Sequence, residues 1–464
     1  MRFLHCVLAL VLTGASSVLV CAAPPAAQRK VLPQAKRLTR VFFQDDDTKT
    51  VKWADVLAGQ PPQLSAVQEV DGFPKLDVTR QTLVQMESAK GHLLVGVRDD
   101  ADGAFQSGWV LIDTGLDTAD HGNHLDWIYA RSPQVKAKRL DDKQGNPAHL
   151  YCYEDEFYLA NDKLNGFTRL APAEIKSTDD EAAIQKRAAF HQGGGGHITL
   201  AVMGHRVAYS SWNDREGTNM GRVDLTLISA EGTIQLAASL NLPHGGIHGA
   251  TVCADKIFFA PSDGICWLKA DGTIPVDPLS IKVNHLSLGK DGEKPRRTGA
   301  FSTLQNHVAF TTGAGPNTAL CLINATQPEP SVIRLPVKMA EGNRPAGLAL
   351  VKPRRGNPIA IMFHDHADDS MAPNRMSLIE LDPNGDGQWT DLRVGPEYNV
   401  GKSKMEAHGG HHSITFDSDR FRAIFSNPGD GTLVLFSLDT RQPIVTYKVG
   451  GTPSKVMAIG GHTH

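Results

Sequence analysis

One pattern of short β-strands recurs along most of the chain, and it constrains the fold more than any other feature. In its clearest copy, residues 412–449, runs of β-branched and aromatic residues alternate with clusters of Gly, Asp and Asn. Six other segments fit the same template. The seven copies start near Thr82, His149, His197, His248, Gly299, Pro345 and His412. A four-stranded unit of about 50 residues, repeated in this way, is typical of a β-propeller.

We therefore predict an all-β fold, a β-propeller with seven blades, or alternatively eight, in which residues 81–464 form a single domain. Residues 28–80 lack a clear period and are expected to form a tail with one edge strand. Four cysteines lie after the predicted signal segment, and none of them forms a CxxC pair. We therefore expect these cysteines to be buried small residues or to form one disulfide, and we expect no thiolate metal site. They are Cys152, Cys253, Cys266 and Cys321.

The first 27 residues have the pattern of a secretory signal peptide. A short charged start is followed by an apolar run from Phe3 to Cys21 and then by small residues up to Ala27. No later stretch approaches the roughly 20 apolar residues that cross a bilayer. We expect an exported protein, periplasmic or secreted, whose mature chain does not insert into the membrane.

Charge and motifs narrow the functional classes. The 47 Lys and Arg residues nearly balance the 50 Asp and Glu residues, for a net charge of −3, which disfavours nucleic-acid binding. No GxSxG elbow is present, and the glycine run 193–196 lacks the Gly-Lys-Ser/Thr of a phosphate loop. The sequence thus shows no nucleophile or base motif of an enzyme.

The positions of the histidines in the repeats are the strongest indication of a function. Of the 19 histidines, His149, His197, His248 and His412 share one position, the start of the innermost strand of a copy. The loops entering these strands lie on one rim of a propeller, so we expect the four imidazoles to converge there. The same loops add His244, His408 and His411 among glycines. Converging neutral imidazoles suit zinc. The alternative is a histidine that hydrogen-bonds within its own blade as part of the repeat.

Two further histidine pairs lie elsewhere. His121 and His124 are flanked by carboxylates between Asp120 and Asp126, either as metal ligands or as a solvated polar loop. His364 and His366 have HxH spacing, which places both rings on one side of an extended chain, so they are either a pair of metal ligands or part of a surface loop. The predicted zinc ligands are drawn from His121, His124, His149, His197, His244, His248, His408, His411 and His412.

These motifs resemble those of the bacterial periplasmic zinc metallochaperones, the AztD-like β-propellers, over roughly residues 80–460. The matching stretches are 112–116, 120–124, 146–149, 246–250 and 427–431, and His121-Gly-Asn-His124 is the most specific of them. The family more usually has Asp where this chain has Asn123. The resemblance implies a propeller that passes zinc to the solute-binding protein of a zinc ABC transporter.

Three functions follow as hypotheses. The first is a zinc-binding propeller that stores zinc or delivers it to such a solute-binding protein. The second is a metal-dependent hydrolase that uses the same rim, with Glu406 or Asp120 as the available carboxylate. The third is a protein-interaction propeller whose histidines bind no metal.

Overall fold

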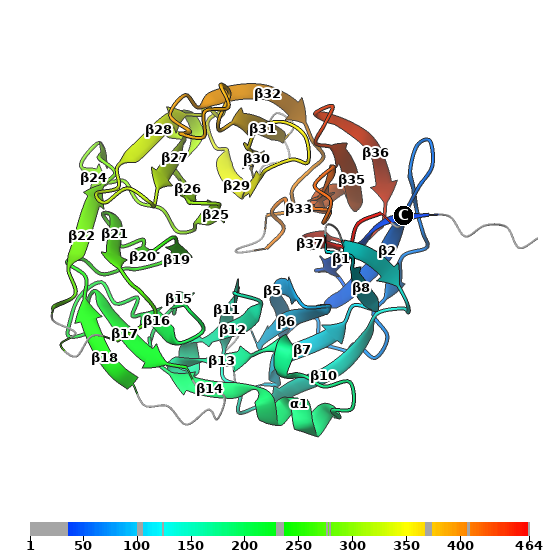
Figure 1. The fold of residues 1–464 in the computed structure, drawn as a ribbon, viewed down its shortest axis with the longest axis horizontal. Coiled ribbons are helices and arrows are strands. Elements are labelled where there is room, and N and C mark those ends of the chain that lie inside the picture. The colour runs from blue at the N-terminus through cyan, green and yellow to red at the C-terminus, as the bar shows by residue number, and fades with distance from the viewer. Residues whose placement is uncertain are drawn as a thin grey trace, which may run out of the picture. The chain divides into compact units, whose positions relative to one another are not determined.

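Eight antiparallel sheets surround a common axis in the computed structural model of the chain (Figure 1). The structure describes residues 36–99, 105–122, 125–228, 236–274, 277, 280–366, 374–405 and 409–462, so the predicted signal peptide lies outside it. The fold is a β-propeller, as predicted. The expectation of seven blades is corrected to eight.

Seven blades are built from strands that follow one another in the sequence, and their innermost strands match the seven predicted repeat starts. From the axis outward, they are β5 (Gln81–Ala89), β6 (His92–Asp99), β7 (Ser107–Asp113), β10 (Gln134–Asp141); β11 (Pro147–Tyr153), β12 (Glu156–Asn161), β13 (Gly166–Leu170), β14 (Ala189–Gln192); β15 (Leu200–Met203), β16 (Val207–Ser211), β17 (Arg222–Leu227), β18 (Leu236–Asn241); β19 (Ala250–Cys253), β20 (Lys256–Phe259), β21 (Gly264–Lys269), β22 (Val283–Ser287); β25 (Ser302–Leu304), β26 (His307–Thr312), β27 (Ala319–Asn324), β28 (Val332–Pro336); β29 (Arg344–Val351), β30 (Ile359–Asp365), β31 (Arg375–Glu380), β32 (Arg393–Asn399); and β33 (Ile414–Phe416), β34 (Arg422–Asn427), β35 (Thr432–Ser437), β36 (Gln442–Lys448).

The eighth blade, called here the closing blade, combines segments from both ends of the described chain. Its innermost strand is β37 (Pro453–Ile459), which pairs with β1 (Arg37–Asp45), followed by β2 (Thr50–Leu57) and β3 (Gln63–Leu64), while β4 (Gln68–Glu69) also pairs with β2. In this ladder Val41 lies opposite Ala458. Residues 37–64 are therefore blade strands, whereas the sequence suggested a tail with one edge strand.

The remaining elements are short and decorate the ring. A hairpin of β8 (Leu116–Asp120) and β9 (Leu125–Tyr129) follows β7, and β23 (Lys290–Asp291) pairs with β24 (Lys294–Pro295). The single-turn elements are η1 (Asp162–Leu164), η2 (Pro172–Glu174), η4 (Gly315–Asn317) and η5 (Pro428–Asp430), and α1 (Glu181–Arg187) is an α-helix. No helix in the described part of the chain is both long enough and apolar enough to cross a membrane.

The core lies between neighbouring sheets, where alternate side chains of each strand are buried. One cluster joins β6 and β7 to β12 and β13 through Trp109, Phe157 and Leu170, all at most 1% exposed. Each such side chain contributes about 2 kcal/mol through burial of apolar surface. The cysteines belong to this packing: all four are free thiols, and burial raises the pKa of Cys321 to about 12.

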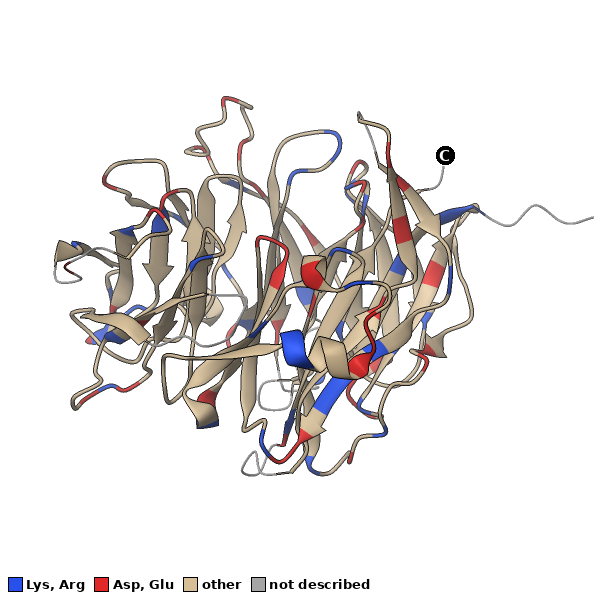
Figure 2. Cartoon of the chain, turned by 60° about the horizontal axis from the view of Figure 1, so that its bottom comes forward, with Lys and Arg blue, Asp and Glu red and all other residues tan. Residues whose placement is uncertain are grey.

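The innermost strands all begin at the same end of the axis, and this polarity places the functional loops. We call this end the entry rim. The turn between β5 and β6 lies at the other end, and β7 finishes beside it, because Asp113 pairs with His92. Acidic and basic residues are interspersed over the blades in the view of Figure 2, consistent with the near-balanced charge.

One carboxylate ties the closing blade together. Asp45 at the end of β1 accepts hydrogen bonds from Lys52 Nζ at 2.6 Å and from the Thr452 amide, just before β37, at 2.9 Å. Burial alone would raise the pKa of Asp45, but these hydrogen bonds outweigh burial and lower it. The ionised form is therefore preferred in the folded protein.

We expect Asp45→Ala to lower the free energy of unfolding at pH 7 by about 2 kcal/mol, the contribution of hydrogen bonds to a charged group. Because the folded pKa is depressed, this stabilisation is present above about pH 4 and is lost as the pH falls through the folded pKa. Urea unfolding at pH 7 and pH 3 measures both effects. Exposed Asp291→Ala is the control, and equal losses in the two variants would contradict the assignment.

Candidate metal centre

Three histidines from three successive blades meet at the entry rim. His149 lies on β11, His197 precedes β15 and His248 precedes β19. The ring centroids are 4.6 Å apart for His149 and His197, 5.0 Å for His197 and His248, and 6.1 Å for His149 and His248. Each residue is partly exposed. We refer to these three side chains as the histidine trio.

Two rings of the trio, those of His197 and His248, are oriented by oxygen atoms that contact their Nδ1 atoms. His197 Nδ1 lies 2.8 Å from Asp162 Oδ2, and His248 Nδ1 lies 3.2 Å from the carbonyl oxygen of Gly299. A carboxylate or carbonyl behind Nδ1 fixes the proton there and leaves the Nε2 lone pair for a metal, an arrangement common around zinc. The Nε2 atoms of His149 and His197 are 2.9 Å apart.

Asp162 is a site residue that the sequence did not single out. It begins η1 directly after β12, and its Oδ1 accepts the Ile198 amide at 2.9 Å. One carboxylate therefore holds both the ring of His197 and the backbone that follows it. Its sequence context, Asn161-Asp162, has the form of an ordinary turn, so only the three-dimensional contact reveals the role.

The glycine run before His197 is explained by packing. Residue Gly195 lies against the indole ring of Trp212, and a Cβ at this position would overlap that ring. The amide of Gly195 also donates to the Ser211 carbonyl at 3.2 Å. The loop is thus held against β16 of its own blade, which brings His197 to the axis.

The surroundings of His248 favour the neutral form of its imidazole. Burial is the largest cause of its lowered pKa, and the nearby charges of His197 and Arg297 lower it further, against the opposing effect of the Gly299 carbonyl. A neutral imidazole is the form that binds a metal. The site is therefore prepared for a ligand role at neutral pH.

The donor atoms of the trio suit a metal ion, but two of its nitrogen atoms lie closer together than they would around a bound ion. Over the described ranges, no three His, Cys, Asp or Glu side chains are already spaced to hold an ion. The 2.9 Å between His149 Nε2 and His197 Nε2 is a hydrogen-bond length. Nitrogen ligands on tetrahedral zinc, at bonds of 2.0–2.1 Å, lie roughly 3.3 Å apart. Binding therefore requires these two rings to separate by a few tenths of an ångström.

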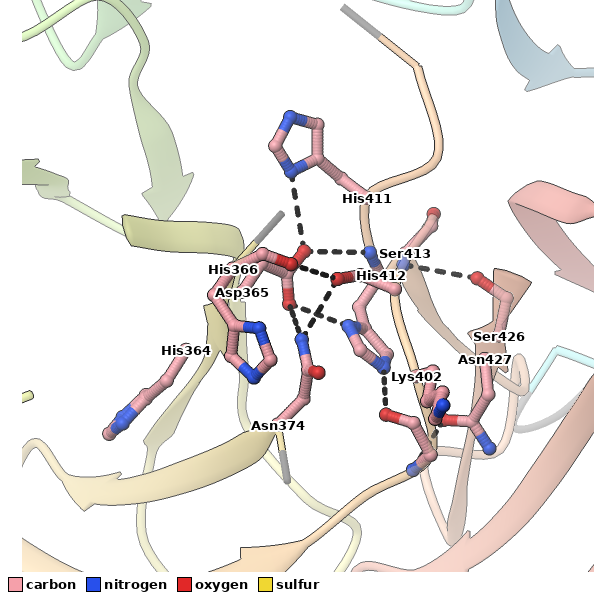
Figure 3. Close-up of polar contacts among 12 residues, drawn as sticks. His364, Asp365, His366, Asn374, Lys402, His411, His412, Ser413, Ser426 and Asn427 are labelled. Carbon is pink, nitrogen blue, oxygen red and sulfur yellow. Dashed lines mark hydrogen bonds and ion pairs between the residues drawn. The ribbon is translucent and has the colours of Figure 1, made fainter. Parts of the chain in front are cut away.

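His411 and His412 belong to a separate cluster, shown in Figure 3. The His412 side chain is fully buried, with Nδ1 2.6 Å from Asp365 Oδ1 and Nε2 3.1 Å from the Gly401 carbonyl oxygen. Its ring also stacks on Phe363, with centroids 4.8 Å apart. Both nitrogens are occupied by protein groups, so His412 has a structural position and does not converge with the trio, contrary to expectation.

His411 is attached more loosely to the same carboxylate. Its Nδ1 lies 3.3 Å from Asp365 Oδ2, and its side chain is 32% exposed and turns away from the buried group in Figure 3. The HxH pair is not at the surface: His364 and His366 are both buried, and His364 Nε2 lies 2.8 Å from Ser377 Oγ. The sequence did not indicate that Asp365 between them would anchor His412.

Two further predicted ligands, His244 and His121, each pair with a carboxylate that is not part of the trio. His244 pairs with Asp263, with Nε2 3.1 Å from Oδ2. His121 pairs with Asp126 at 3.2 Å near the tip of the β8–β9 hairpin, which leaves β7 at the end of the axis opposite the entry rim. His124 and His408 lie outside the described residues.

Comparisons with known proteins support the fold. The chain is similar to the crystal structure of Citrobacter koseri AztD and to the structure of apo AztD from Citrobacter koseri, with TM-scores of 0.60 and 0.59. In both cases the identity is 15%, and the match covers 92% of this chain and 99% of the other. It is also similar to the dihydro-heme d1 dehydrogenase NirN bound to DHE, with a TM-score of 0.50, 12% identity and coverage of 90% and 74%. Neither a protein-family model nor a curated protein sequence matches the chain.

The Asp365 cluster yields a prediction that separates structural from ligand histidines. The hydrogen bonds from His411 and His412 outweigh burial and hold the pKa of Asp365 well below its usual value. Removing one partner of a buried charge costs about 3 kcal/mol. We expect His412→Ala to lower the free energy of unfolding by that amount while zinc affinity stays at the wild-type value.

His411→Ala is the matched control, since the contact of its partly exposed side chain contributes at most about 1 kcal/mol. Denaturant unfolding and a zinc titration of each variant provide the measurements. A stable His412→Ala protein with weakened zinc binding would return His412 to the metal site.

Proposed function

We propose that this chain is an exported zinc-binding β-propeller that stores zinc or delivers it to the solute-binding protein of a zinc transporter. The observation that carries the proposal is the meeting of His149, His197 and His248 at one rim, with Nδ1 of two of them held from behind. The motif resemblance to zinc metallochaperones and the likeness to AztD over most of the chain support it.

Zinc is the ion that this donor set favours. Imidazole nitrogens are borderline ligands that suit zinc, whereas calcium and magnesium prefer oxygen. Three protein ligands leave one position of a tetrahedral zinc ion open to water or to a ligand from another protein. In this proposal, zinc is the ion that the protein carries and passes on, and it is not a permanent cofactor.

The accessibility of the trio favours transfer over a permanent structural role. All three residues are partly exposed, and the His197 side chain is 32% exposed. A partner can replace the ligands one at a time at such a rim, which a fully enclosed site would prevent. Export follows from the predicted signal peptide and matches a role in periplasmic zinc traffic.

The hydrogen bonds of Asp162 favour a zinc-binding role over a catalytic one. Of the two carboxylates expected to serve a hydrolase, Asp120 lies in the hairpin that leaves β7 at the end of the axis opposite the trio, and Glu406 lies outside the described residues. In a metal-dependent hydrolase, a carboxylate near the ion often accepts a proton from the metal-bound water. Asp162 instead has one oxygen on His197 Nδ1 and the other on the Ile198 amide. It is a positioning residue for His197 in this proposal.

We expect His197→Ala and His149→Ala each to weaken zinc binding at least tenfold, and Asp162→Asn to weaken it about 10- to 100-fold through the orientation of His197. The measurement is a zinc titration against a competing chelator. His205→Asn is the control, because His205 also contacts a carboxylate, Glu154, at 3.0 Å but lies in a turn at the other end of its blade. Wild-type affinity in both alanine variants would refute the trio as a zinc site.

Zinc affinity should depend on pH in the manner of an imidazole site. An ordinary histidine titrates near pH 6.5, and burial places the pKa of His248 lower, so protons compete with zinc only below that range. We expect the logarithm of the affinity to be nearly flat from pH 7 to 8 and to fall steeply between pH 6.5 and 5. Affinity that persists unchanged to about pH 4 would indicate carboxylate ligands instead.

A further inference from the structure

A group of two histidines and one aspartate lies at the entry rim of the blade β19–β22. His244, in the loop before β19, and His285, on the outermost strand β22, both face Asp263 in the turn between β20 and β21. Their Nε2 atoms lie 3.1 and 3.2 Å from the same atom, Asp263 Oδ2. The two rings have centroids 5.8 Å apart.

The other oxygen of Asp263 is the second observation. Asp263 Oδ1 is buried and has no hydrogen-bond partner within the described residues. A buried carboxylate oxygen without a partner is costly, and such an atom in a folded protein calls for an explanation. A cation beside this carboxylate would compensate for that cost.

The backbone around the group is built to bring these three side chains together. The Ser262 amide donates to the Gly245 carbonyl at 3.0 Å, which joins the turn of Asp263 to the loop of His244. Gly264 has a φ of 157°, and a Cβ there would meet the Leu286 carbonyl and lie 3.1 Å from His285 Nε2. A side chain at Gly264 would therefore obstruct His285.

We propose that His244, Asp263 and His285 form a second divalent-cation site, of zinc class, separate from the histidine trio. Two imidazole nitrogens and one carboxylate oxygen are a known ligand set for zinc and for other first-row metals. The nitrogen–oxygen separations of 3.1 and 3.2 Å are close to the roughly 3.3 Å expected between ligands on tetrahedral zinc. Small rotations of the rings toward a shared centre complete the site, and the remaining positions take water.

The exposure of the group indicates an accessible site. The side chains of His244, His285 and Asp263 are 52%, 29% and 18% exposed. His244 lies four residues before His248, so one loop carries a ligand of each site. We call the site of His244, Asp263 and His285 the outer site. It does not depend on the proposed function, since none of its ligands belongs to the trio.

Zinc titrations of four variants by calorimetry test the outer site separately from the trio. We expect His285→Ala to bind one equivalent fewer than wild type and to keep the zinc of the trio. His149→Ala should lose the equivalent of the trio and keep that of the outer site, and the double variant should lose both. His205→Asn should match wild type, and thermal melting of the metal-free proteins checks that each variant folds.

The possible outcomes are distinct. Unchanged zinc stoichiometry and affinity in His285→Ala would overturn the outer site while leaving the trio intact. Unchanged binding in His149→Ala, with a loss in His285→Ala, would support the outer site and reject the proposed function at the trio. Displacement of the outer equivalent by millimolar calcium would also overturn the assignment, because a site with two imidazoles favours zinc over calcium.

Discussion

The common direction of the innermost strands is the constraint on which the rest of this structure depends. Because every innermost strand starts at the same end of the axis, the loops that enter neighbouring blades lie next to one another. Histidines about 50 residues apart in the sequence are thereby brought within ring contact, as His149, His197 and His248 are. A fold built from local hairpins in this way assembles a site that no single blade contains.

The seven blades whose four strands follow one another in the sequence could be predicted from the repeat. Seven innermost strands begin near the expected positions because each blade is a run of consecutive antiparallel strands with a clear period of two. The eighth blade was missed because its strands come from residues 37–64 and 453–459, so no stretch of sequence contains the complete unit. A long-range ladder such as that of Val41 with Ala458 has no local signature.

The histidine site could be predicted where the position of a residue within the repeat is enough to determine its place in the fold. Three of the four histidines at the shared position converge, whereas His412 is drawn into the blade by Asp365, a residue at the end of β30 in the neighbouring blade. Asp162, Asp263 and His285 carried no signal either, because their importance arises from contacts between turns and strands of different parts of the chain. Periodicity reports which end of a strand a residue occupies, and only the tertiary structure reports which partner it meets there.

The pairing of β1 with β37 has a consequence for biosynthesis. A chain synthesised from its N-terminus presents β1, with the buried Phe42 and Phe43, long before residues 453–459 are available to cover its edge. An uncovered apolar strand edge is a template for aggregation. The earliest part of the propeller to emerge is thus the last to be completed, and the interval between these events is the time during which the nascent protein most needs protection.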